Sequence, residues 1–150
     1  MLRRLTLFLA LASVALAQAT VEPPSKLLLR IEGFTGASYS VELVPDSSTV
    51  RYRHNSETFT NAESTKEEKI EIAKERWAIF WKRLEDAKVW TWKKRYTVAP
   101  NPPDGTAWSV TLDWSGHSIS SSGVNAYPDA KQFGLFKSAV SELLEGRKFE

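Results

Sequence analysis

The chain has 150 residues, with 20 Lys and Arg against 18 Asp and Glu, and it contains no cysteine. This near balance of charge disfavours a nucleic-acid-binding protein, which needs a basic excess. The absence of cysteine excludes disulfides, thiolate metal sites, cysteine nucleophiles and a lipid anchor on an N-terminal cysteine.

The N-terminus has the pattern of a secretory signal peptide. Arg3 and Arg4 precede an apolar stretch over residues 5–16, which at 12 residues is too short to span a bilayer as a helix. Two small-x-small sites for signal peptidase follow at residues 15–17 and 17–19. We therefore expect a periplasmic or secreted protein.

The expected organisation is a signal peptide over 1–19, an extended lead-in over 20–25 and a single domain over 26–150. Cleavage after Ala19 removes two of the 20 basic residues, which leaves 18 basic against 18 acidic residues. No other apolar run approaches 18 residues, so we expect no membrane anchor.

Three strands open the domain. Apolar and polar residues alternate over 26–32, 39–43 and 50–55. Because the connections between them are too short for parallel crossovers, we expect an antiparallel meander.

A helix is predicted next, over about 65–87. A capping box of Ser64 with Glu67, or Thr65 with Glu68, is typical of a helix start. Apolar residues then recur every three or four positions, as on the buried face of a helix. Over residues 89–96 the period becomes that of extended chain.

The second half predicts a hairpin and a helix. Alternating residues over 108–114 and 117–121 flank a Ser-Gly turn at 115–116. A helix follows over about 129–145, and Gly146 ends it.

The predicted fold class is α+β with two layers, in the order β-β-β-α-β-β-α. One antiparallel sheet of about five strands carries both helices on one face. Eight residues are expected to be buried between the layers: Trp77, Phe80, Leu84, Val110, Leu112, Phe136, Val140 and Leu143.

Asp113, His117 and Ser118 form the one candidate catalytic group. Residues 116–120, Gly-His-Ser-Ile-Ser, resemble the G-x-S-x-G elbow of α/β-hydrolases, but they lack its final glycine and its strand–turn–helix context. Because neighbouring residues of a strand point to opposite faces, His117 and Ser118 are predicted to diverge and not to be catalytic. With two histidines in the chain, we expect no metal site and no cofactor.

Five residues are candidates for ligand binding. Trp90 and Trp92 leave the helical pattern beside Lys94, so they serve either as core or as an exposed platform for a ligand. Asn125 and Tyr127 lie in a Gly-x-Asn-Ala-Tyr-Pro turn, for which a structural role is favoured over ligand binding.

Four patterns together resemble a class of uncharacterised exported bacterial proteins. They are Trp-x-x-Phe-Trp at 77–81, Trp-x-Trp at 90–92, Asp-Gly-x-x-Trp at 104–108 and Gly-x-Asn-Ala-Tyr-Pro at 123–128. The resemblance implies a compact α+β domain and brings no assigned activity.

Three functions agree with these patterns. The preferred one is an exported, non-enzymatic domain that binds a protein or a cell-envelope component. The alternatives are a small hydrolase of envelope polymers and a carbohydrate-binding module that uses exposed Trp90 and Trp92. The expected partner is an envelope protein or glycan, with no nucleic acid; the oligomeric state stays open.

Overall fold

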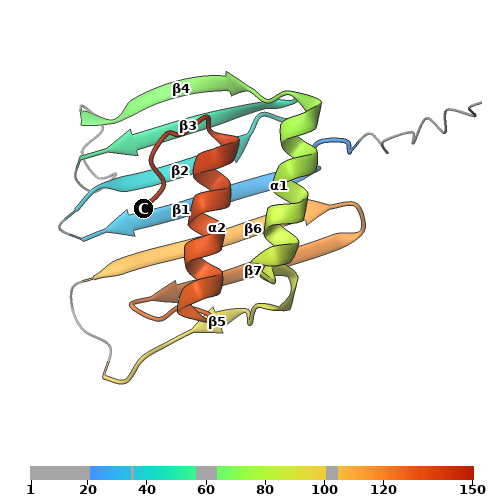
Figure 1. Cartoon of the computed structure of the whole chain (residues 1–150). Coiled ribbons are helices and arrows are strands. Elements are labelled where there is room, and N and C mark those ends of the chain that lie inside the picture. Colours follow the sequence, from blue (N-terminus) through green and yellow to red (C-terminus); the bar gives the residue numbers. More distant parts are fainter. Residues whose placement is uncertain (1–20, 35, 57–63, 101–104) are drawn as a thin grey trace, which may run out of the picture.

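A computed structural model of the chain describes residues 21–34, 36–56, 64–100 and 105–150. The expected signal peptide lies outside these ranges. The fold is α+β, with one sheet and two α-helices, as the sequence predicted (Figure 1). None of the helices described is long and apolar enough to cross a membrane.

The described ranges contain a seven-stranded sheet in the order β4-β3-β2-β1-β6-β7-β5. Neighbouring strands are antiparallel, except that β5 runs parallel to β7. The strands are β1 (Lys26–Gly33), β2 (Ser38–Leu43), β3 (Thr49–Asn55), β4 (Lys66–Glu71), β5 (Arg95–Tyr96), β6 (Thr106–Trp114) and β7 (His117–Val124). The helices are α1 (Lys74–Asp86), the short 3-10 helix η2 (Val89–Thr91) and α2 (Ala130–Leu143).

The expected count of about five antiparallel strands is therefore wrong, and β4 is the main reason. Its charged residues pair across the sheet with β3: Glu67 lies 2.7 Å from Arg53 and 3.3 Å from Arg51. Its one apolar residue, Ile70, is buried opposite Val50. These cross-strand pairs override the local preference for helix. The charged edge also resists pairing with another chain.

The predicted capping boxes do not form, because Glu67 and Glu68 lie in β4. The first helix is consequently shorter than expected and begins at Lys74. Its N-cap residue, Ala73, makes no capping hydrogen bond through its side chain.

Residues 89–96 also differ from the extended chain that was expected. Lys88 adopts a left-handed conformation (φ 54°) after α1, and the chain then makes one turn of 3-10 helix. Only Arg95 and Tyr96 pair with the sheet, beside Ser122 and Gly123 of β7.

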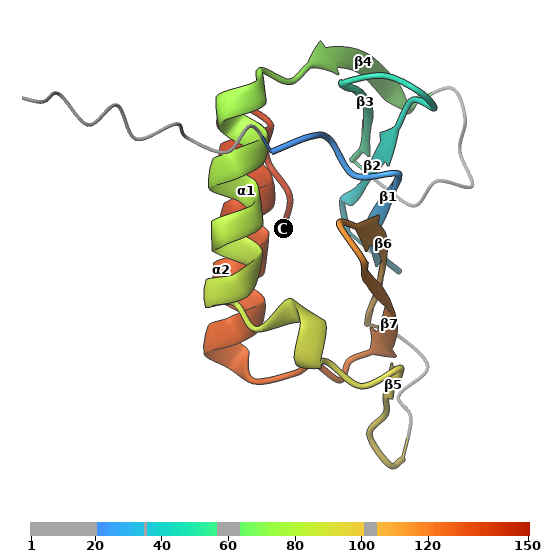
Figure 2. The same ribbon diagram turned by 90° about the vertical axis from the view of Figure 1, so that its right-hand side faces the viewer.

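Both α-helices pack on the same face of the sheet, and no helix of the described residues covers the other face (Figure 2). The core lies between the two layers. All eight residues predicted to fill it are buried: Trp77, Phe80, Leu84, Val110, Leu112, Phe136, Val140 and Leu143.

The C-terminal tail closes one side of this core. Phe149 is buried and its ring contacts Tyr39 and Phe136. The hydroxyl of Tyr52 donates a hydrogen bond to the carbonyl of Lys148, at 2.7 Å. The tail therefore joins the β2–β3 part of the sheet to α2.

Candidate functional site

A pocket of about 580 Å³ lies at the end of the sheet where β1 ends, β6 begins and β7 ends. Its walls come from β1, the segment after β5, the connection from β7 to α2, and the first two turns of α2. The volume is in the range of small-ligand sites. Central to it are six residues: Ile31, Val98, Ala126, Tyr127, Phe133 and Lys137.

Exposed apolar side chains gather at this end of the molecule. Phe34 is 54% exposed, Val98 41% and Tyr127 39%. Val98 and Tyr127 line the pocket, and Phe34 follows β1, where its N–H donates to the carbonyl of Gly105. The other large apolar residues exposed in the described ranges, Ile79 and Leu135, lie on the helices. Such clustering is typical of interaction surfaces.

Asn125 fixes the wall that carries Tyr127. Its backbone is left-handed (φ 51°), a conformation that Asn tolerates better than most residues. Its side-chain oxygen accepts a hydrogen bond from the N–H of Thr106 at 2.9 Å, and its own N–H donates to the Thr106 carbonyl at 3.0 Å. Asn125 therefore ties the end of β7 to the start of β6.

Gly123 allows a close approach behind the same wall. A Cβ at this position would lie 2.2 Å from the carbonyl oxygen of Ala126 and 2.7 Å from Nε1 of Trp108. Those two atoms are themselves joined, because the Trp108 indole donates to the Ala126 carbonyl at 2.7 Å. This hydrogen bond and the close approach at Gly123 hold the turn against the core and place Tyr127 at the pocket.

Aromatic rings form the inner surface of the pocket. The ring centroids of Tyr127 and Phe133 are 4.8 Å apart, and those of Tyr127 and Trp108 are 6.4 Å apart with the rings nearly parallel. Tyr96 contacts the same Trp108 at 5.8 Å. Because Phe133 and Trp108 are buried, they hold the exposed ring of Tyr127 in a fixed orientation.

Gly134 contributes open space. It lies inside α2, where glycine costs about 0.5–1 kcal/mol relative to alanine. A Cβ added here would meet nothing within 4 Å, so packing does not require a glycine. Gly134 lines the pocket, and the missing side chain leaves its mouth wide.

Two charged side chains border the pocket. The ammonium of Lys137 lies 5.7 Å from the ring centroid of Phe133, and Lys137 makes no ion pair within the described residues. Glu150 is already partnered, because Nζ of Lys148 lies 3.3 Å from its carboxylate. Lys137 is thus the cation available to a ligand.

The structure brings together two of the five residues predicted to bind ligand. Asn125 and Tyr127 both line the pocket, although the amide of Asn125 is engaged with the backbone. Trp92 lies directly behind them in the core, where its ring contacts Trp108 and Phe133. Trp92 is 7% exposed and therefore offers no face to solvent.

Trp90 and Lys94 lie outside the pocket. Trp90 packs against Trp81 and His117. Lys94 is exposed, and its carbonyl accepts a hydrogen bond from the N–H of Ser122. The exposed, coplanar pair of indoles that the carbohydrate-binding alternative requires is not formed, because η2 turns Trp92 into the core.

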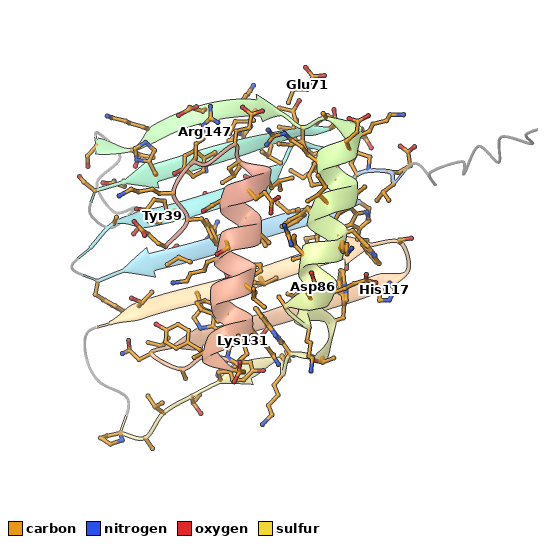
Figure 3. All side chains as sticks on the ribbon, viewed as in Figure 1. Tyr39, Glu71, Asp86, His117, Lys131 and Arg147 are labelled. Carbon is orange, nitrogen blue, oxygen red and sulfur yellow. The ribbon has the colours of Figure 1, made fainter. Side chains whose placement is uncertain are left out.

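His117 and Ser118 diverge, as predicted. His117 lies on the helix-covered face against Trp81 and Trp90, at the opposite end of β7 from the pocket (Figure 3). Ser118 points to the other face, where its hydroxyl donates to the carboxylate of Asp113. The three side chains do not converge as a triad. No group of three or more metal-ligating residues occurs within the described ranges.

Val98, Gly134 and Lys137 are among the pocket residues that were not singled out from the sequence. The position of Gly134 inside an amphipathic helix was a usable signal, since an isolated helical glycine usually has a packing or functional reason. Val98 and Lys137 carried no comparable signal, because they come together only through the tertiary fold.

No protein-family model matches the chain, and no curated protein matches its sequence. The resemblance to exported bacterial proteins stays a prediction.

Proposed function

We propose that this protein is an exported binding domain whose pocket beside Tyr127 holds an apolar group of an envelope protein or of another cell-envelope component. The observation that carries the proposal is the pocket of about 580 Å³ bordered by the exposed side chains of Val98 and Tyr127. Export is inferred from the signal-peptide pattern of residues 1–19.

Gly134 supports a binding role over a purely structural one. Glycine makes the helix less stable at this position than alanine would. No neighbouring atom lies close enough to exclude a larger side chain. A small residue that costs stability and widens a pocket is what a trade-off between stability and binding produces.

The test uses N-phenyl-1-naphthylamine, a neutral aromatic probe whose fluorescence rises in apolar sites. We expect saturable, one-to-one binding to the mature protein. Gly134→Leu should weaken binding at least tenfold, because its side chain fills the pocket. The same substitution should raise the free energy of unfolding by about 0.5–1 kcal/mol, from helix propensity, so that lost binding cannot be ascribed to unfolding.

The matched control is Ser138→Leu, which adds the same side chain to an exposed position of α2 that does not line the pocket. It should bind the probe like the wild type. If the wild type shows no saturable binding, or if both variants bind equally well, the proposed site is wrong.

A further inference from the structure

The ammonium of Lys137 places a positive charge at the border of the pocket, and a purely apolar ligand would not interact with that charge. The residue is half-buried on α2, one helical turn after Phe133, and its ammonium lies over that ring. It makes no ion pair among the described residues, whereas the carboxylate of Glu150 at the same border lies 3.3 Å from Nζ of Lys148 in an exposed ion pair. An anion that entered the pocket would therefore find a free cation beside an apolar wall.

The aromatic wall of the pocket favours a ligand that carries a ring system. Tyr127 is 39% exposed, and Phe133 contacts it at a centroid distance of 4.8 Å. Aromatic pairs in tilted or offset arrangements gain free energy beyond that of area burial alone. A flat ring system placed against Tyr127 makes such a pair, and it covers the exposed face of that side chain.

We infer that the pocket takes an aromatic anion, with its ring body against Tyr127 and Val98 and its negative headgroup at the ammonium of Lys137. This inference rests on the proposed function and names the chemical class of the ligand. We do not place the headgroup at the N-terminus of α2. There the Asp129 carboxylate already accepts a hydrogen bond from the N–H of Gln132.

The experiment compares two probes with the same ring body. N-phenyl-1-naphthylamine is neutral, and 8-anilinonaphthalene-1-sulfonate carries a sulfonate. The wild type should bind the anion roughly fivefold more tightly than the neutral probe, the effect of one partly exposed ion pair. Raising the salt concentration to about 1 M should shrink this preference, since the Debye length falls to about 3 Å.

Lys137→Gln should abolish the preference for the anion over the neutral probe, and circular dichroism checks that the variant is folded. Lys131→Gln is the control, because Lys131 is exposed on the first turn of α2 (Figure 3) and is not among the residues that line the pocket. It should keep the full preference for the anion.

Two results would overturn the inference while leaving the proposed function intact. One is equal binding of the two probes by the wild type, and the other is a preference that survives Lys137→Gln. Displacement of the bound anion by decanoate but not by 1-naphthaleneacetate would likewise refute a ring body. Failure of the neutral probe to bind at all would instead refute the proposed site.

Discussion

Tyr52 links the third strand to the C-terminal tail through a single hydrogen bond to the carbonyl of Lys148. Burial, reinforced by the nearby groups of Tyr39 and Glu68, raises the pKa of Tyr52 to about 12 from its usual value of 10. The folded protein therefore holds the phenol proton more tightly than the unfolded chain does. This one residue makes the stability of the fold sensitive to alkali.

The raised pKa of Tyr52 predicts a reversal of stability in the variant Tyr52→Phe. Below pH 10 both states of the wild type are protonated, and the variant should be less stable by about 1 kcal/mol for the lost hydrogen bond. Between pH 10 and 12 the unfolded wild type loses the proton first, so the wild type should lose about 2–3 kcal/mol relative to the variant. Urea unfolding of both proteins at pH 8 and near pH 12 measures the difference. Parallel stability curves for the two proteins would contradict the prediction.

The first helix contributes the largest fully buried side chain among the described residues of the core. Trp77 of α1 is fully buried, and its ring contacts Phe80 and Trp114. Two layers are held together at this point, because Trp114 belongs to β6 of the sheet. Truncation here removes contacts to both layers.

We predict that Trp77→Ala lowers the free energy of unfolding by about 3–5 kcal/mol, the range for large aromatic residues in cores. Ile79→Ala on the same helix is the control, since Ile79 is 46% exposed and should cost less than about 1 kcal/mol. Thermal unfolding followed by circular dichroism compares the two. An unchanged midpoint for Trp77→Ala would show that the buried face of α1 is assigned wrongly.

The sequence predicted well those elements in which the spacing of apolar residues matches the face that the fold buries. The central strands and the apolar stripe of α1 are of this kind. By contrast, β4 carries almost no apolar pattern, and its Glu67 is paired with Arg53, which lies directly opposite on β3, and with Arg51 on the diagonal. No local rule supplies that partner.

Long-range contacts also limited the prediction of the site. Asn125 and Tyr127 were found through the chemistry of their turn, which is local. The burial of Trp92 depends on η2 and on rings from β6 and α2, so its alternation with Trp90 was misleading. Long-range packing decided which aromatic side chains face solvent.

At the scale of the whole molecule, the residues just after the expected signal peptide already belong to the fold. The indole of Trp114 donates to the carbonyl of Glu22 at 2.8 Å, and the N–H of Ser25 donates to the carbonyl of Asp113 at 3.0 Å. Cleavage after Ala17 or Ala19 would leave these bonds intact.

We therefore predict an exported protein that begins at Gln18 or Thr20 and carries no lipid. Intact mass of the exported form is the measurement. Ala17→Arg should block both cleavage sites, because position 17 is a small residue of each, and should cause the precursor to accumulate. A wild-type mass equal to that of the full chain would contradict the prediction.

The position of Phe149 has a consequence for the timing of folding. Its ring fills the space between β2 and α2, and β1 cannot complete its ladder until β6, about 80 residues later, has been made. A chain that emerges N-terminus first therefore lacks part of its core until its 149th residue is available. In the export that we propose, the protein should consequently stay unfolded while it crosses the membrane and reach its native state only once translocation is nearly complete.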